Sequence, residues 1–163
     1  MTKTCKFCWA LSALLFLTVL GMAYLFLLRG NITASDDGRT AIAITAGERN
    51  LVLGDMRGFL EAVQAITSAA AEGDMSAAAE AASAVGMASA GNAPPTLMGK
   101  LPLEFKTLGL ETHSLFDDLA KAASDNGDAS AVMAGLGDLM LNCTSCHAGY
   151  KLVTETTGSG DTK

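Results

Sequence analysis

An uninterrupted apolar run near the start of the chain constrains its organisation more than any other feature. The twenty residues from Trp9 to Leu28 carry no charge, and Arg29 closes the run. A helix of that length rises about 30 Å, which is the thickness of the hydrocarbon core of a bilayer. Lys3 and Lys6 precede the run, which favours an orientation with the N-terminus inside and the rest of the chain outside.

Two kinds of segment share this length and composition, an uncleaved membrane anchor and a cleaved signal peptide. A signal peptide usually has a shorter apolar region that is closely followed by a cleavage site between small residues. No clear site of that kind follows Leu28. We therefore expect residues 1–8 to be cytoplasmic, residues 9–28 to form a single transmembrane anchor in the inner (cytoplasmic) membrane, and the remaining chain to lie in the periplasm.

Composition excludes several classes of protein. The 163 residues include 17 acidic and 11 basic side chains, for a net charge of −6, and half of the chain is apolar. An acidic chain of this kind lacks the basic surface of a nucleic-acid-binding protein, so no nucleic-acid partner is expected. Its apolar content is too high for a disordered protein. Four cysteines are too few for a disulfide scaffold, so each pair must be interpreted by its spacing.

The sequence after the anchor has the pattern of an all-α domain. Residues 29–44 are expected to form a polar linker, and residues 154–163 a flexible tail. Between them we expect four amphipathic helices, at 45–72, 75–90, 102–123 and 128–153. The pattern Thr45-Ala46-Gly47-Glu48 is a capping box for the first helix. Short connections between four such helices predict an antiparallel four-helix bundle over residues 45–153, with Leu60 and Met140 among the inward side chains.

The sequence Cys143-Thr144-Ser145-Cys146-His147 carries the chemistry of the chain. CxxCH is the attachment motif of c-type haem. Its two thiols reach the two vinyl groups on one edge of the porphyrin, and the imidazole of His147 can then ligate the iron. A thioredoxin-type site would need a βαβ unit, which the pattern lacks, and a disulfide between the two cysteines is the remaining alternative. We therefore expect one covalently bound haem c.

A second CxxC pair, Cys5 and Cys8, lies just before the anchor. A zinc site shared with the later pair is excluded because the bilayer would separate the two. We expect two reduced thiols on the cytoplasmic side, and lipidation of a juxtamembrane cysteine is the alternative.

The segment Cys143–Lys151, CTSCHAGYK, resembles the end of the last helix in the cytochrome c′ family, in which a tyrosine and a basic residue follow the haem attachment motif. The resemblance covers roughly residues 45–153 and implies a four-helix bundle with the haem near its C-terminus. The family often has arginine where this chain has Lys151, and many members are soluble, whereas this chain is expected to be tethered. The resemblance also makes a homodimer through the first two helices an option.

The resemblance further implies that the first helix faces the iron on the side opposite His147. Arg49, Leu53 and Met56 share one face of that helix. Their pattern resembles five-coordinate family members, in which an apolar side chain, here Leu53, covers the iron and small gases such as NO compete for it. Related bundle cytochromes supply a methionine thioether instead, and we favour Met56 as the second ligand. The alternative for Met56 is a simple core position.

Three further side chains are assigned roles by the same comparison or by their positions. Arg49 would lie near the haem edge and pair with a propionate, or else remain a solvated charge in the first helical turn. Tyr150 is expected to pack near the proximal side of the haem. His113 is the only other histidine and falls on the flank of its helix's apolar stripe, so we expect it at the surface or rim rather than on the iron.

These features favour an electron carrier that serves a redox protein or membrane complex. Haem with histidine and methionine ligands changes redox state with little rearrangement. Gas binding at a five-coordinate iron is the alternative. A haem peroxidase would need a distal acid–base group, and the stripe of the first helix offers neither histidine nor carboxylate. We therefore expect no catalytic residues and no enzyme activity.

Overall fold

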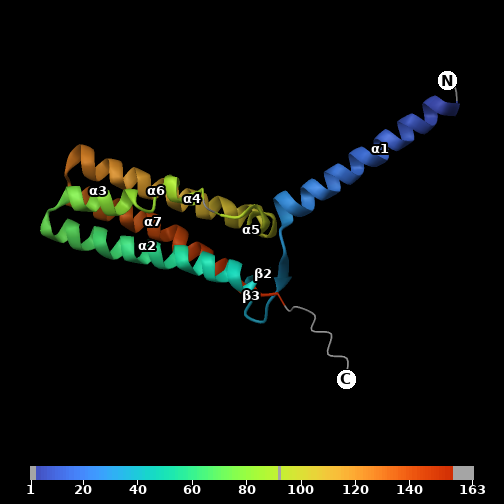
Figure 1. The fold of residues 1–163 in the computed structure, drawn as a ribbon. Helices are drawn as coiled ribbons and strands as arrows, with labels where there is room; N and C mark the ends of the chain where they lie inside the picture. The colour runs from blue at the N-terminus through green and yellow to red at the C-terminus, as the bar shows by residue number, and fades with distance from the viewer. Residues whose placement is uncertain (1–2, 92, 156–163) are drawn as a thin grey trace.

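The computed structural model describes residues 3–91 and 93–155, and it is mostly helical. Helix α1 (Lys3–Ala23) continues into a π-helical segment, η1 (Tyr24–Arg29). Figure 1 shows α1 projecting from the rest of the molecule as a separate rod. The stretch Lys6–Arg29 is long and apolar enough to cross a membrane, and none of it is buried. A signal sequence and a single membrane anchor both have these properties.

The next helix, α2 (Ala46–Glu72), begins and ends at local signals. The side-chain oxygen of Thr45 accepts a hydrogen bond from the backbone N–H of Glu48, and the Glu48 carboxylate accepts one from the backbone N–H of Thr45. This confirms the capping box. The helix ends at Gly73, whose φ of 76° lies in the left-handed region that glycine adopts without strain.

Five further helices follow α2 in the described chain: α3 (Met75–Ser83), α4 (Met87–Ala90), α5 (Pro95–Lys100), α6 (Leu103–Asn126) and α7 (Ala129–Gly149). Pro102 immediately precedes α6, and Asp128 caps α7 by accepting a hydrogen bond from the backbone N–H of Ser130 at 2.9 Å. Helix α5 was not predicted. The predicted end of the last helix at residue 153 is wrong, because Tyr150–Thr154 forms a strand.

The helix predicted over residues 75–90 is interrupted between α3 and α4. The Asp117 carboxylate, from α6, accepts a hydrogen bond from the backbone N–H of Met87 at 3.0 Å. The same carboxylate occupies the space that a side chain at Gly86 would fill. A tertiary contact therefore starts a new helical turn at Met87, which the alanine-rich sequence of this segment did not reveal.

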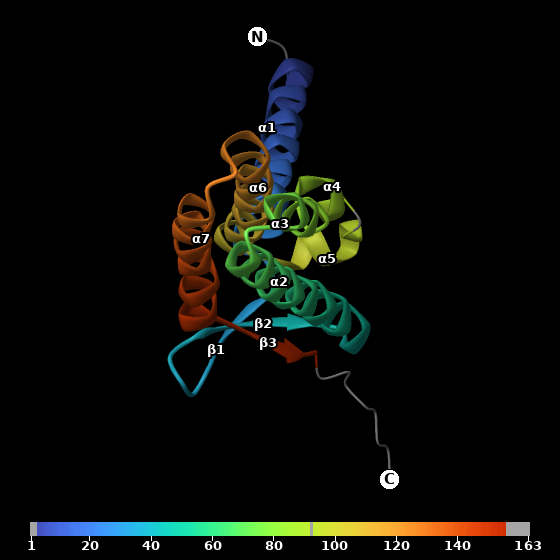
Figure 2. The same ribbon diagram turned by 90° about the vertical axis from the view of Figure 1, so that its left-hand side faces the viewer.

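Four helices, α2, α3, α6 and α7, pack around one group of buried side chains, which we call the helical core. Figure 2 shows them grouped about a common centre, and the seam between α2 and α7 is the least extensive of the four contacts between neighbours. Leu60 and Met140, which were expected to point inward, are instead 69% and 45% exposed. The helical core comprises Ala62, Ile66, Ala69, Ala70, Met75, Ala78, Ala82, Phe116, Leu119, Ala120, Ala123, Val132, Leu136 and Leu139.

A three-stranded sheet corrects the expectations of an all-α domain and of a polar linker over residues 29–44. Strand β1 (Ile32–Ala34) pairs antiparallel with β2 (Thr40–Ile44), and β2 pairs in parallel with β3 (Tyr150–Thr154). Ile42 and Ile44 are fully buried. The alternation Thr-Ala-Ile-Ala-Ile is a strand signal, but β3, with which this strand pairs in parallel, lies at the opposite end of the domain's sequence. Thr154 therefore belongs to the sheet, and residues 156–163 of the predicted tail lie outside the described chain.

A second group of buried side chains, which we call the sheet core, lies at the end of the helices that carries the sheet (Figures 1 and 2). It forms where the start of α2 and the end of α7 meet β2, α5 and the start of α6. Its buried members are Ile42, Ile44, Leu97, Leu101 and Phe105, and the half-buried side chains packed on them are Ile32, Val52, Met56, Met98, Cys146, Tyr150 and Leu152.

The junction between the apolar helix and the domain is also direct rather than a loose linker. Gly30 has a φ of 67°, and a Cβ there would lie 2.5 Å from the carbonyl oxygen of Lys100. The backbone N–H of Asn31 donates to that same oxygen at 2.6 Å. The Lys106 ammonium donates to the carbonyl oxygen of Leu27 at 3.2 Å. The end of η1 is thus fastened to both α5 and α6.

Candidate haem site

The two cysteines of the CxxCH motif continue the inward-facing stripe of α7. That stripe passes through Leu136 and Leu139, both buried, and then through Cys143 and Cys146, both half-buried. Cys143 packs on the helical core and Cys146 on the sheet core. The motif therefore lies where the two cores meet.

Both thiols are free of disulfide bonds, so the alternative of a bond between Cys143 and Cys146 finds no support in this structure. Burial raises the pKa of the Cys143 thiol above its ordinary value. Burial also raises the pKa of the Cys146 thiol, and the neighbouring Cys143 adds to that effect. Both groups are therefore neutral thiols near neutral pH, in a setting that does not favour a free thiolate.

The side chain of His147 is exposed at the end of α7. Its backbone carbonyl accepts a long hydrogen bond from Arg39 Nη1, at 3.4 Å. Arg39 in turn forms an ion pair with Asp37 at 2.7 Å, and this bond to Arg39 holds the pKa of the Asp37 carboxyl well below its usual range. The turn between β1 and β2 thus places a guanidinium against the carbonyl end of α7, where the helix dipole favours a cation.

Met56 is half-buried on α2 and packs on the sheet core, as Cys146 does from α7. The structure therefore brings this predicted ligand and one attachment cysteine to the same apolar cluster. Leu53 and Arg49 are also half-buried on α2, but neither is among the side chains packed in the helical core or the sheet core of the described chain.

Tyr150 lies directly after α7 and connects it to α6. Its ring packs edge-to-face on Phe105 at a centroid distance of 5.5 Å, and its hydroxyl donates to Glu104 Oε2 at 2.9 Å. Burial and the neighbouring Glu104 carboxylate raise the pKa of Tyr150 to about 12. The phenol therefore stays protonated as a donor. Lys151, the basic residue after it, forms an ion pair with Asp36 at 2.8 Å.

His113 lies apart from the motif, against the helical core. It is half-buried, and its Nδ1–H donates to the carbonyl oxygen of Val85 at 2.8 Å. Its ring meets Phe59 edge-on at a centroid distance of 4.8 Å. These contacts connect α6 to α2 and to the segment between α3 and α4.

Sequence reasoning missed the side chains that build the sheet side of the site. Four side chains that pack or hydrogen-bond at the end of α7 were not predicted to belong to the site: Arg39, Ile42, Glu104 and Phe105. The run Tyr150–Thr154 contains an aromatic and two β-branched residues, which is a strand signal. The sequence analysis did not use that signal and extended the last helix to residue 153.

The donor set fits a haem. Two neutral, unpaired thiols and an imidazole stand in sequence at a helix end, beside an apolar cluster that holds a thioether sulfur. In the described chain, no three histidine, cysteine or acidic side chains cluster as a metal site made only of protein ligands would require. An iron held by a macrocycle needs only axial side chains, so the CxxCH set suffices for it.

Comparisons of the chain with models of protein families, with characterised proteins and with solved structures found no match.

Proposed function

We propose that this chain is a membrane-anchored c-type monohaem cytochrome that carries electrons on the periplasmic side of the inner membrane. Cys143 and Cys146 would hold the haem through thioether bonds, and His147 and Met56 would ligate its iron. When bound, haem c supplies a reversible one-electron couple.

One observation carries this proposal: the attachment cysteines lie on the inward face of α7, and Cys146 shares the sheet core with Met56. Cys146 and Met56 come from different helices, yet both pack on the same apolar cluster. Fewer residues of α2 and α7 approach one another than in the other three pairs of neighbouring helices. Room for a flat ligand between those two helices is what the proposal requires.

The fold offers further support for the cytochrome c′ resemblance. Short turns at Gly73 and Gly127 join α2 to α3 and α6 to α7, which favours antiparallel neighbours within each pair, and a longer connection through α4 and α5 joins the two pairs. The sheet is an addition to that plan. Ile42 and Tyr150, from two of its strands, pack in the same sheet core as Met56.

The protein's own residues would tune the site in defined ways. The neutral thioether of Met56 favours reduced iron, which suits an electron carrier. Tyr150 and Phe105 supply an apolar wall beside Cys146. His147 is exposed at the end of α7, so this edge of the site would be accessible to a redox partner.

An absorption spectrum of the purified membrane protein tests the ligand set. We expect a low-spin, six-coordinate spectrum, because His147 and Met56 would both ligate the iron. The variant Met56→Ala should convert it to a high-spin spectrum and lower the reduction potential. The matched control is Met98→Ala, since Met98 is a second half-buried methionine of the same sheet core, on α5; this variant should stay low-spin.

A high-spin spectrum in the unmodified protein would contradict Met56 as ligand. It would instead support five-coordinate iron with Leu53 above it, and binding of NO. The covalent attachment is tested separately by acid-acetone extraction. Haem should be retained by the protein and by Cys8→Ala, whose thiol is exposed on α1, but released from the double variant Cys143→Ala, Cys146→Ala.

A further inference from the structure

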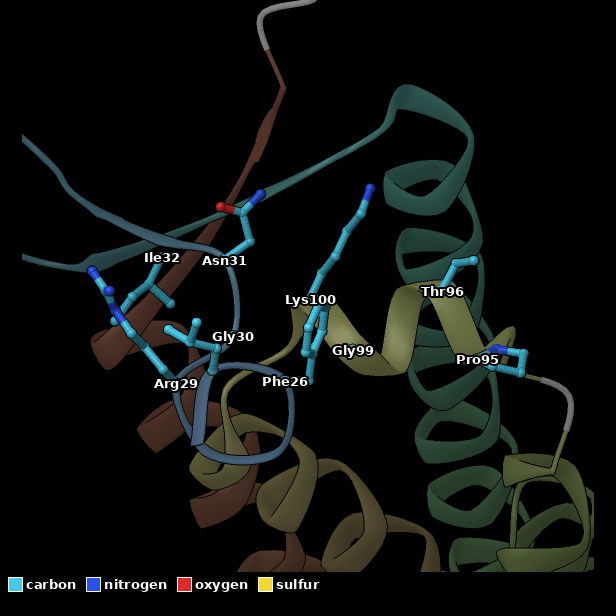
Figure 3. A pocket seen from close by; sticks show the side chains of 10 residues that line it. Phe26, Arg29, Gly30, Asn31, Ile32, Pro95, Thr96, Gly99 and Lys100 are labelled. Atoms are coloured by element: carbon cyan, nitrogen blue, oxygen red, sulfur yellow. The ribbon is translucent and has the colours of Figure 1, made fainter. Parts of the chain in front are cut away.

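A pocket of about 600 Å³ lies at the junction of η1, β1 and α5. Figure 3 shows Arg29 and Ile32 on one side of it and Lys100, Gly99, Thr96 and Pro95 on the other. Leu25 and Phe26, from the last turns of the apolar helix, also line it. The walls are therefore mainly apolar, with cationic side chains at two points.

The pocket is built on a rigid frame. The contact of Gly30 with the carbonyl of Lys100 leaves no room for a side chain, and the hydrogen bond from the Asn31 N–H fixes the same point. Phe26 lies close to Gly99, because a Cβ at Gly99 would be 3.6 Å from Phe26 Cδ1. These contacts join the end of η1 and the segment after it directly to α5 at the pocket.

The charge of the pocket contrasts with that of the chain. The lining contains two cations and no carboxylate, although the net charge of the protein is −6. Lys100 is neutralised by ion pairs with Glu48 at 2.8 Å and Glu155 at 2.9 Å. Arg29 is exposed, and no carboxylate of the described chain forms an ion pair with it. Its guanidinium is therefore available for an external anion.

The position of the pocket identifies the source of that anion. Leu25, Phe26 and Arg29 belong to the stretch that is able to span a membrane, so one wall of the pocket is the end of that stretch. With the helix in a bilayer, the pocket opens at the boundary between hydrocarbon and headgroups. A phosphate ester with a glycerol and acyl chain matches a guanidinium beside an apolar wall.

We propose that this pocket binds the headgroup region of an anionic phospholipid, with the phosphate on Arg29 and the glycerol and upper acyl chain against Leu25 and Phe26. The inference rests on the proposed function in one respect, which is that the apolar helix is retained as an anchor. The bound lipid would then fill the junction between the anchor and the haem domain.

Native mass spectrometry of the full chain, released from detergent, tests this inference with phosphatidylglycerol and with diacylglycerol, which lacks the phosphate, as probes. We expect phosphatidylglycerol to be retained at least about tenfold better, which is the ratio of affinities that the free energy of one charge-assisted hydrogen bond gives. Arg29→Gln should abolish this preference, and Gly99→Leu, which fills the pocket, should reduce retention of both lipids. Arg57→Gln is the matched control, because Arg57 is an exposed arginine of α2 outside the pocket lining.

Equal retention of the two lipids, or equal losses in Arg29→Gln and Arg57→Gln, would overturn the proposal. Displacement of phosphatidylglycerol by inorganic phosphate at the same concentration would also overturn it and assign the site to the free anion. The intact mass from the same experiment reports whether the apolar helix and the haem are present. A chain that lacks the helix refutes the anchor and the lipid site together, whereas a complete haem-loaded chain without lipid preference refutes the lipid site alone.

Discussion

The helical core and the sheet core are built from different kinds of sequence information. In the helical core, short turns join α2 to α3 and α6 to α7, and the helices bury their own stripes. Half of the buried side chains are alanine, which lets the helices approach closely. In the sheet core, Ile42 lies opposite Leu152 in a parallel pair of strands that come from opposite ends of the domain's sequence. Contacts between segments close in the sequence, as in the helical core, form readily. The pairing of β2 with β3 in the sheet core needs the helices to bring distant segments together first. The sheet core should therefore depend on the helical core more than the reverse.

The largest effect is expected from Phe116→Ala in the helical core. Phe116 is fully buried and stacks on Phe59 at a centroid distance of 5.4 Å. Its truncation should lower the free energy of unfolding by about 3–5 kcal/mol, because a large cavity replaces an aromatic ring. Chemical denaturation followed by circular dichroism measures this loss. Hydrogen exchange should accelerate in both cores, and a sheet core that keeps its protection would contradict the dependence. Leu60→Ala, at an exposed site, serves as the near-neutral control.

A smaller and more local effect is expected from Ile44→Ala in the sheet core. Ile44 is fully buried in β2, so its truncation should cost about 2–5 kcal/mol of local stability. Hydrogen exchange followed by mass spectrometry should show faster exchange in β1–β3 and α5, while α3 and the middle of α6 keep their protection. Ile44→Val should produce the same pattern at about 0.5–1.5 kcal/mol. Equal acceleration in α3 would mean that the two cores unfold as one unit.

Acid should destabilise the sheet core before the helical core, without any substitution. The bond to Lys100 lowers the pKa of the Glu48 carboxyl, and the bond to Lys151 lowers that of Asp36. A carboxyl whose pKa is lowered by folding stabilises the protein above its ordinary pKa, and this stability is lost as the pH falls through the lowered value. Exchange at the sheet should therefore accelerate below about pH 4, before the helices lose ellipticity.

The control for the acid experiment removes one cation at a time. Lys100→Met should weaken the sheet by about 1 kcal/mol at pH 7 and remove most of the Glu48 contribution to its acid sensitivity. Lys121→Met removes an exposed pair with Asp125 on α6, so it should change neither core measurably. Simultaneous loss of α6 and β2 on acidification would contradict this separation.

The same contrast explains how much of the fold could be predicted from the sequence. The capping box at Thr45 is a local signal and was predicted correctly, and the expected helix bounds at residues 72 and 128 agree with the glycine end at Gly73 and the Asp128 cap. The full sheet could not be predicted from such signals, because Thr40–Ile44 pairs with the nearby Ile32–Ala34 on one edge but with Tyr150–Thr154, far away in the sequence, on the other. The break at Gly86 likewise depends on Asp117, a side chain of another helix.

The candidate site also has one part that the sequence predicts and another that depends on tertiary packing. Cys143, Cys146 and His147 are contiguous, so their spacing alone predicts haem attachment. The choice between Met56 and Leu53 depends on which α2 side chain faces the cluster around Cys146, and that requires the tertiary packing. Membership of the sheet core distinguishes Met56 from Leu53, a distinction that helical periodicity could not make.

For the tethered electron carrier proposed above, the close contact at Gly30 would also determine how the domain reaches its partners. A flexible linker would let the domain sample a hemisphere of heights and tilts above the bilayer. Gly30 instead fastens the last turn of the apolar helix to the backbone of Lys100, and the sheet end of the domain lies at that same junction. With the helix embedded, the domain keeps one height and one tilt, and only lateral diffusion and rotation about the membrane normal remain. Electron exchange would then be restricted to partners whose own redox centre lies at the matching height above the lipid.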